Sequence, residues 1–218
     1  MKKTTLQPIN INDVYHTIKS PIVSIKSLLF VIGRNKDIQS NEVLKEKISQ
    51  VDHKVTLLHK RAEIFLNYIL YKEEQIEFLY SFFNLSEVLK KNIEDSSLKI
   101  SLNYTTEKLI MADKDQLQEA FRTIFNEIAA SINSNELFIK INFVRRNVVV
   151  DFKYNANISE EHNNQPINSD EICVAREQNF IAHKIIEMHG GSIEQIKNND
   201  EVHLKVTLPL KAKTREKK

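Results

Sequence analysis

Two long stretches of apolar residues at helical spacing fill the first third of the sequence. In residues 11–32 the apolar positions lie three or four apart, at Ile11, Val14, Ile18, Ile22, Ile25, Leu29 and Ile32. Residues 44–69 alternate strictly between steps of four and three, at Leu44, Ile48, Val51, Val55, Leu58, Ala62, Phe65 and Ile69. Such spacing places the apolar side chains on one face of an α-helix. The chain is therefore expected to begin with two helices joined by a polar turn, an antiparallel hairpin about 40 Å long at 1.5 Å per residue.

The hairpin by itself would cover only one side of each helix. Further apolar residues stand beside both seams, among them Val23, Leu28 and Phe30 in the first helix and Leu57 and Ile64 in the second. Two hairpins paired into a four-helix bundle would cover this surface, which predicts a homodimer. The alternative is that the surplus apolar surface packs against the rest of the same chain.

From about residue 77 the pattern changes to short strands alternating with helices. We expect strands at residues 79–83, 99–103, 108–111, 137–144, 147–154, 192–197 and 201–208, and helices at 86–94, 114–132 and 176–189. Asp113 with Gln116 resembles a capping box at a helix start, and Gly190-Gly191 is a C-terminal stop. Residues 155–175 are expected to form a loop. Three helices over one mixed sheet make an α/β sandwich.

The predicted fold class is therefore α+β, with the helical hairpin in front of the sandwich. We place the hairpin at residues 1–76, the sandwich at 77–210 and a basic tail at 211–218. The tail is interpreted as solvated, although its charges could contact nucleic acid or anionic lipid.

Composition excludes several classes of protein. With 31 basic and 29 acidic residues the net charge is +2, which favours no nucleic-acid partner. A single cysteine, Cys173, permits neither an intrachain disulfide nor a cysteine-based zinc site, and the histidines suggest no metal site. No apolar run approaches the roughly 20 residues of a membrane span. We therefore expect a cytoplasmic protein without a membrane or metal partner.

Residues 16–21 read His-Thr-Ile-Lys-Ser-Pro on the first predicted helix. His16 lies about 200° around the helix from Val14, so it should face away from the seam and be accessible to solvent. A free imidazole has a pKa near 6.5, is largely neutral in the cytoplasm and offers a nitrogen lone pair to a phosphoryl group. The alternative is a solvated surface histidine without a chemical role.

The order of a helical hairpin and an α/β sandwich resembles the transmitter core of sensor histidine kinases. Residues 16–21 are similar to the family's H-box, in which His, an acidic residue, an aliphatic residue, a basic residue, Ser or Thr, and Pro follow in order. Residues 185–194 and 202–210 resemble the family's last helix, turn and hairpin, so the resemblance covers nearly the whole chain. It implies that His16 accepts a phosphoryl group and that the rest of the motif is formed by Thr17, Lys19, Ser20 and Pro21.

Small residues follow His16 on the same helix face. Ser20, Val23 and Ser27 lie four, seven and eleven positions after it, so the receiver domain of a response regulator could approach the histidine closely. Small residues would equally suit a packed bundle. Pro21 removes one backbone donor and should bend the helix just after His16.

The resemblance also assigns the positions at which kinases of this family hold Mg²⁺ and the adenine of ATP. Thr123 and Glu127 occupy the places of two asparagines, and Asn126 is displaced by about 100° of helix rotation. Lys153 stands where an aspartate would accept a hydrogen bond from adenine, but lysine has donors only. Glu127 could still bind Mg²⁺ through oxygen.

The glycine-rich parts of that site are also altered. Asn155 and Asn157 replace glycines of an Asp-x-Gly-x-Gly turn, which adds side chains where ligand must pass. The lid region, residues 159–176, contains no glycine, and the chain has only three. Without a glycine-rich loop there is no phosphate cradle. These losses argue against ATP hydrolysis and autophosphorylation, so we expect no cofactor beyond the Mg²⁺ that a receiver brings.

Thr17 occupies the position of a carboxylate that helps to remove a proton from the histidine in active kinases, and threonine cannot act as that base. Exchange with a receiver aspartate demands less, because the receiver supplies Mg²⁺ and acidic residues. The sequence thus predicts a histidine phosphotransferase of a phosphorelay acting through His16. Its expected partners are a second copy and a receiver domain, with an upstream hybrid kinase as a further candidate. The alternatives are a divergent active kinase that uses Glu127 for Mg²⁺, and a pseudokinase adaptor that is not phosphorylated.

Overall fold

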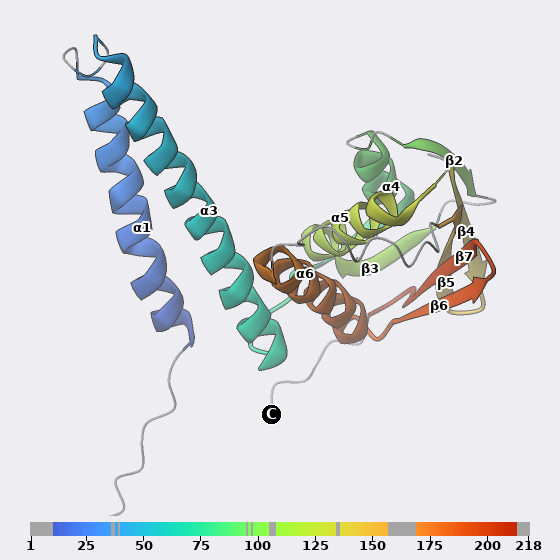
Figure 1. Cartoon of the computed structure of the whole chain (residues 1–218). Coiled ribbons are helices and arrows are strands. Elements are labelled where there is room, and N and C mark those ends of the chain that lie inside the picture. The colour runs from blue at the N-terminus through green and yellow to red at the C-terminus, as the bar shows by residue number, and fades with distance from the viewer. Residues whose placement is uncertain are drawn as a thin grey trace, which may run out of the picture. The chain divides into compact units, whose positions relative to one another are not determined.

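The computed structural model describes residues 11–35, 38, 40–94, 96, 98–104, 108–133, 136–156 and 169–212. The chain divides into two compact units, Met1–Glu74 and Gln75–Lys218. The first contains a pair of long helices, and the second contains β-strands together with shorter helices (Figure 1). We describe each unit separately, as a helical unit and an α+β unit.

The helical unit consists of α1 (Ile11–Gly33) and α3 (Glu42–Lys72), which pack side by side as the apolar spacing predicts. Asn41 begins α3 as its N-cap, because its side-chain oxygen accepts the Leu44 N–H at 3.2 Å. Pro21 lies inside α1, where it cannot donate to the carbonyl of Thr17.

Burial divides the apolar residues of each helix into two sets. One set is buried or half-buried within the hairpin: Ile18, Ile22 and Leu29 on α1, and Ile48, Val55 and Ala62 on α3. The other set on α3 repeats every seven residues and leaves 46–55% of each side chain exposed, at Leu44, Val51, Leu58 and Phe65. Ile25 and Ile32 on α1 are exposed at the same interval, 44% and 43%. A single hairpin therefore leaves a second apolar seam uncovered.

The α+β unit is built on a five-stranded mixed sheet with the strand order β2-β4-β5-β7-β6. Its strands are β2 (Lys99–Tyr104), β4 (Glu136–Val144), β5 (Asn147–Asn155), β6 (Ser192–Asn198) and β7 (Glu201–Pro209). Strand β2 runs parallel to β4, and the other neighbours are antiparallel. In the described part of the unit three helices pack together: α4 (Leu85–Glu94), α5 (Lys114–Ser131) and α6 (Ser169–Met188) (Figure 1).

Every second side chain of the central strands is buried on the face of the sheet that carries the helices. On β5 these are Val148, Val150, Phe152 and Tyr154. The ring of Phe152 packs edge-on to Phe125 of α5, with centroids 5.6 Å apart, and lies 6.3 Å from the ring of Phe121. Burial of such large rings, each of which removes 150–250 Å² from water, fixes α5 on this face.

Two further strands, β1 (Tyr80–Asn84) and β3 (Leu109–Asp113), form a separate antiparallel sheet. The expectation of a single sheet is thus wrong. The free edge of β3 is taken by the C-terminal segment, because the Met111 N–H donates to Leu210 O at 2.8 Å and the Ala212 N–H to Met111 O at 2.9 Å. Lys211 and Ala212, expected in the tail, therefore belong to the folded unit.

Helix α6 begins at Ser169, although residues up to 175 were expected to form a loop. Its first residues read Ser-Asp-Glu, which provides little apolar periodicity. The same residue types favour a helix N-terminus, because a hydroxyl can cap free N–H groups and carboxylates complement the helix dipole. These preferences allow the helix to start earlier than its apolar stripe indicates.

The end of α6 is joined to the start of α5 by a buried histidine. The Asp113 N–H donates to His189 Nε2 at 3.1 Å, so the ring proton sits on Nδ1 and is donated to Ile185 O at 2.7 Å. The His189 ring stacks on Phe78 at 4.4 Å between centroids. Asp113 in turn caps α5, as predicted, since its carboxylate accepts the Gln116 N–H at 3.0 Å.

Helix α6 stops in a Schellman motif, which confirms the predicted stop at Gly190-Gly191. The Gly190 N–H donates to Glu187 O and the Gly191 N–H to Ile186 O, at 2.8 and 2.9 Å. Gly190 has a φ of 80°, which L-residues rarely adopt. At Gly191 a Cβ atom would collide with Thr207 O and would lie 3.0 Å from side-chain carbons of Ile186 and Leu208.

We expect Gly191→Ala to destabilise the protein more than Gly190→Ala. The clash with the Thr207 backbone forces the α6–β6 turn to move, at a cost of about 1–3 kcal/mol, whereas the left-handed backbone at Gly190 costs about 1 kcal/mol. Thermal denaturation of both variants followed by circular dichroism tests this order. An equal or larger loss for Gly190→Ala would contradict it.

We expect His189 to make stability depend on pH. Burial lowers the pKa of His189 below its ordinary value of 6.5, so the unfolded state binds more protons and the contribution of His189 to stability is lost as the pH falls through about 6.5. His189→Phe keeps a ring against Phe78 but leaves the Asp113 N–H without its acceptor, which costs about 1–3 kcal/mol.

Urea denaturation at about pH 7.5 and about pH 5.5 measures both effects. The free energy of unfolding of the wild type should fall more steeply than that of His189→Phe between these pH values. Equal pH dependence in the two proteins would show that His189 is not the group responsible.

Candidate functional site

His16 lies in the second turn of α1. Its side chain is outside the described residues, so the accessibility expected for His16 stays a prediction. Thr17, Ser20 and Pro21 are exposed, and Lys19 is half-buried. The motif therefore occupies one continuous stretch of helix, with most of its described side chains reaching the surface.

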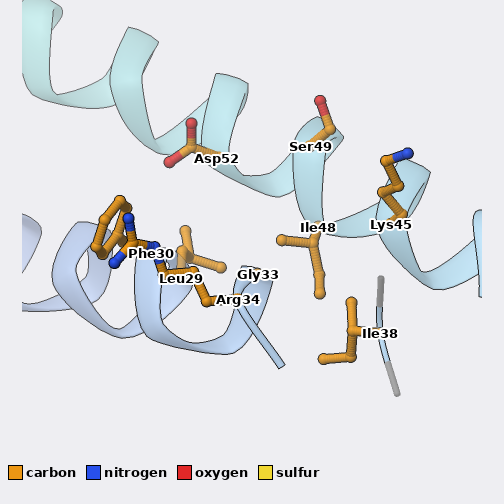
Figure 2. A pocket seen from close by; sticks show the side chains of 9 residues that line it. All are labelled: Leu29, Phe30, Gly33, Arg34, Ile38, Lys45, Ile48, Ser49 and Asp52. Atoms are coloured by element: carbon orange, nitrogen blue, oxygen red, sulfur yellow. The ribbon is translucent and has the colours of Figure 1, made fainter. Parts of the chain in front are cut away.

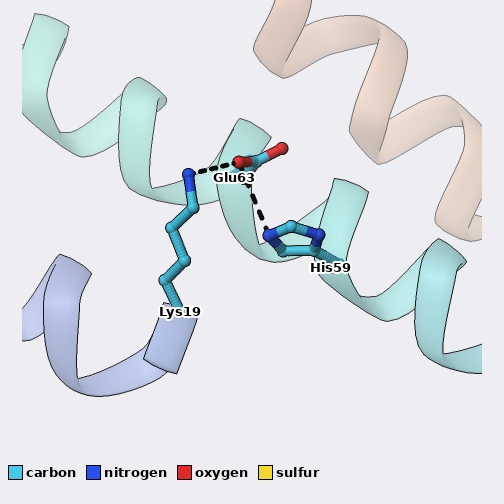
Figure 3. A network of polar contacts seen from close by, with 3 residues as sticks. All are labelled: Lys19, His59 and Glu63. Carbon is cyan, nitrogen blue, oxygen red and sulfur yellow. Dashed lines mark hydrogen bonds and ion pairs between the residues drawn. The ribbon is translucent and has the colours of Figure 1, made fainter. Parts of the chain in front are cut away.

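Lys19 connects the motif to the second helix. Its ammonium lies 2.8 Å from Glu63 Oε1 on α3, and Nε2 of His59 lies 3.5 Å from the same oxygen (Figure 3). The Lys19 and Glu63 side chains are 37% and 38% exposed, so the pair contributes at most about 1 kcal/mol. Its effect is positional, because it ties α1 to α3 one turn after His16.

Glu63 and His59 were not singled out from the sequence. His59 Nε2 is buried and neither accepts nor donates a hydrogen bond in the described structure. Its contact with Glu63 is an ion pair only when the imidazole is protonated. A basic residue at position 19 does predict an acidic partner across the hairpin. Which acid it meets depends on the length of the turn, and that turn fixes the register between the helices.

The three predicted docking residues, Ser20, Val23 and Ser27, are all exposed. The Ser27 hydroxyl donates to Val23 O at 3.0 Å, and that of the neighbouring Ser24 donates to Ser20 O at 3.0 Å. Hydroxyls bonded to the preceding turn do not project from the helix. The helix face that follows His16 therefore carries only short side chains at these positions.

A hollow of about 310 Å³ lies at the opposite end of the hairpin. Its lining side chains come from both helices and the turn between them: Leu29, Phe30, Gly33, Arg34, Ile38, Lys45, Ile48, Ser49 and Asp52 (Figure 2). The Arg34 guanidinium lies 4.5 Å from the centroid of the Phe30 ring. Gly33 is about 25 Å along α1 from His16 at 1.5 Å per residue, so this hollow is separate from the motif.

The positions assigned to Mg²⁺ binding lie on α5. Thr123 is half-buried, whereas Asn126 and Glu127 are exposed. Asn155, at the end of β5, is exposed, and its carbonyl accepts the Asn133 N–H at 2.9 Å. Asn157 and most of the predicted lid lie outside the described residues.

Lys153 does not lie beside these residues. It belongs to the set of β5 side chains on the open face of the sheet, opposite to α5, where it pairs with Phe138 of β4. Its ammonium lies 2.6 Å from Glu201 Oε1, and this contact lowers the pKa of Glu201. The structure therefore separates Lys153 from Thr123 and Glu127 by the thickness of the sheet.

Tyr154 is the β5 residue that faces the helices at this end of the strand. Only 5% of it is exposed, and burial raises the pKa of its phenol, while hydrogen bonds to Ser131 and Gln195 act in the opposite direction. The charge of Glu127 also raises this pKa. The period-two burial of Val148, Val150 and Phe152 was the signal in the sequence that could have identified Tyr154.

The open face of the sheet carries a second polar group. His203 Nδ1 lies 3.5 Å from Asp151 Oδ1, and its Nε2 lies 3.5 Å from Glu201 Oε2. Beside them is a hollow of about 420 Å³ that includes Phe138, Lys140 and Asp151. Lys153 pairs with Glu201 of this group and also lines the hollow, but the group lies on the opposite face of the sheet from Thr123 and Glu127 on α5.

No group of three or more His, Cys, Asp or Glu side chains among the described residues is arranged to hold a metal ion. No helix in the same residues is sufficiently long and apolar to cross a membrane.

Comparison with known proteins identifies solved structures that have a similar fold. No protein-family model and no curated protein matches the sequence. Among solved structures, the Acinetobacter baumannii histidine kinase AdeS is 15% identical, with a TM-score of 0.57 over 89% of this chain and 98% of that protein. Full-length ShkA in complex with AMPPNP is 10% identical, with a TM-score of 0.75 over 94% of this chain and 46% of ShkA. The catalytic domain of the histidine kinase ThkA is 18% identical, with a TM-score of 0.50 over 62% of this chain and 99% of that domain.

The TM-scores establish a shared fold, whereas sequence identities this low leave the activity open. The matches to AdeS and ShkA extend over 89% and 94% of the chain, and the ThkA match is to a catalytic domain. The chain therefore has the α+β fold of histidine kinases, with an ATPase-type unit that follows a helical hairpin.

Proposed function

We propose that the chain is a histidine phosphotransferase of a two-component phosphorelay that exchanges phosphoryl groups with receiver-domain aspartates through His16. The observation that carries the proposal is that Tyr154, on a histidine-kinase fold, is buried on the side of β5 that faces α5. Where the resembled family needs a carboxylate for adenine, β5 turns a buried phenol toward α5 and turns Lys153 to the opposite face. A buried, neutral phenol offers no charged acceptor to adenine.

The chemistry asked of His16 is a simple displacement. The unprotonated ring nitrogen attacks the phosphorus of an aspartyl phosphate, an N–P bond forms, and the P–O bond breaks to release the aspartate carboxylate. A neutral imidazole already has the required lone pair, so no base is needed at Thr17. The receiver's Mg²⁺ stabilises the charge on the transferred group.

The surroundings of His16 suit a protein partner. The short side chains of Ser20, Val23 and Ser27 let another domain approach the helix backbone closely. The Lys19–Glu63 contact holds α1 in place beside α3 while that partner docks. A receiver domain thus meets two helices that already pack side by side, which lowers the ordering cost of binding.

The same proposal includes a homodimer. Leu44, Val51, Leu58 and Phe65 form an exposed row with a seven-residue repeat, and Ile25 and Ile32 continue the pattern on α1. Sustained seven-residue repeats of this kind are covered by another helix in coiled coils and bundles. A second copy supplies two such helices, and a four-helix bundle places one His16 on each protomer.

We expect Leu58→Glu to convert the dimer to a monomer, because two charged side chains would be buried at the bundle seam. Light scattering after size-exclusion chromatography gives the mass directly. Thr56→Glu, an exposed change away from the seam on the same helix, is the control and should remain dimeric. A monomeric wild type, or a Leu58→Glu variant that keeps the mass of two chains, would refute the dimer.

We expect radiolabel to pass to this protein from a phosphorylated receiver domain and not from ATP with Mg²⁺. His16→Ala should abolish the labelling, because alanine has no lone pair to attack phosphorus. His59→Ala, which removes the histidine beside Glu63, should retain it. Autoradiography after denaturing electrophoresis at alkaline pH, where phosphohistidine survives, is the measurement.

The other outcomes separate the rival functions. Label from ATP that depends on His16 would identify a divergent active kinase and overturn the proposal. Absence of label from every receiver tried, with partner binding intact in His16→Ala, would identify a pseudokinase adaptor.

A further inference from the structure

One end of the α+β unit brings together segments that are far apart in the sequence. Leu210 donates its N–H to Arg146 O at 2.8 Å and accepts the Met111 N–H, also at 2.8 Å. Met111 pairs in turn with Phe82 of β1. Neighbouring strands lie about 5 Å apart, so the β4–β5 turn, the C-terminal segment, β3 and β1 form a continuous surface about 15 Å wide.

This surface exposes large apolar side chains. Phe82 and Leu109 lie on the outer face of the β1–β3 sheet, together with Met111, and are 59% and 57% exposed. The alternate residues Ile110 and Ala112 are buried on the opposite face. Exposed apolar residues are ordinary when they are scattered, but a group of them marks an interaction site.

Four cationic residues lie on the segments that form this surface. Lys108, Arg145, Arg146 and Lys211 are all exposed, and none forms an ion pair with a carboxylate in the described part of the chain. Lys211 lies beside Met111 in a parallel bridge, and the Lys108 ammonium lies 5.5 Å from the centroid of the Phe143 ring. The sequence after Ala212 adds Lys213, Arg215, Lys217 and Lys218 against one acid, Glu216.

We propose that this basic apolar surface, formed by Phe82, Leu109, Lys108, Arg145, Arg146 and Lys211, docks on anionic phospholipid bilayers. Cations attract the charged headgroups, and protruding apolar side chains enter the boundary between headgroups and acyl chains. Lys and Arg are suited to this position because their stems can lie along apolar surface while the charges remain at the headgroups.

A bilayer fits these observations better than a nucleic acid or an acidic protein. Single-stranded nucleic acids gain affinity from several aromatic faces on which successive bases stack, whereas Phe82 is the one aromatic ring among the residues that define this surface and Leu109 has no such face. A stable protein interface needs about 1,200–2,000 Å² of matched surface. A bilayer requires no shape complementarity, only apolar side chains that protrude among cations.

The proposal differs from the expectation drawn from the sequence, which gave no membrane partner and interpreted residues 211–218 as a solvated tail, with contact to nucleic acid or anionic lipid as the alternative. It rests on the α+β unit alone, so it stands or falls independently of phosphotransfer at His16. It concerns peripheral attachment, which needs no membrane-spanning helix.

The test is sedimentation of the full chain with vesicles of phosphatidylcholine, with and without phosphatidylserine. We expect binding to the phosphatidylserine vesicles, little binding to pure phosphatidylcholine, and weaker binding as salt is added. Binding to neither kind of vesicle at low salt would overturn the proposal.

A triple variant, Lys108→Gln with Arg146→Gln and Lys211→Gln, localises the site. Each cation near an anionic surface contributes about 1 kcal/mol, so removal of three should weaken the vesicle partition coefficient roughly 100-fold at 1.4 kcal/mol per factor of ten. Lys99→Gln with Lys140→Gln and Lys197→Gln removes the same charge from exposed positions elsewhere on the five-stranded sheet and should retain binding.

Two results would overturn the assignment even if vesicles bind. Equal losses in the two triple variants would mean that net charge, not this surface, drives the attraction. Tighter binding of a fluorescent single-stranded oligonucleotide than of vesicles, abolished in the first triple variant only, would assign the surface to nucleic acid. Circular dichroism of each variant verifies that it is folded.

Discussion

The two-residue period of β5 is the constraint on which most of the α+β unit depends. It puts Val148, Val150 and Phe152 under α5, where Phe152 meets Phe121 and Phe125 and holds the helix to the sheet. The same period turns Tyr154 inward and Lys153 outward. A change of one residue in this alternation would move both the core and the assigned nucleotide position to the other face, so the stability of the unit and the chemistry of the site are coupled through one strand.

The helical unit is governed by a similar division of its apolar residues. One set fixes α1 against α3, and a second set with the same seven-residue repeat is left exposed. This arrangement packs the two helices of the hairpin against each other and leaves a second apolar row exposed along them. The Lys19–Glu63 contact adds little energy, but it joins α1 to α3 one turn after His16.

Strand β3 contributes to two parts of the α+β unit that differ in character. At the end of this strand, the buried His189 and Asp113 connect the termini of α5 and α6 through directed hydrogen bonds. At the basic apolar surface the backbone of the C-terminal segment is paired, while its side chains are left for solvent or a partner. Rigid backbone beneath exposed side chains is what a docking surface requires, because the binding partner need not pay to order it.

Local sequence determined the two long helices, the caps at Asp113 and Gly190-Gly191, and the motif around His16, because apolar period, capping chemistry and glycine conformation act over a few residues. Only the tertiary structure decided which strands share a sheet, that α6 starts at Ser169, that Glu63 meets Lys19, and that Tyr154 replaces Lys153 beside α5. These depend on strand register, turn length and competition for free strand edges. Several of these contacts join residues far apart in the sequence, such as Lys19 with Glu63 and Met111 with Lys211, and no local pattern fixes their pairing in advance.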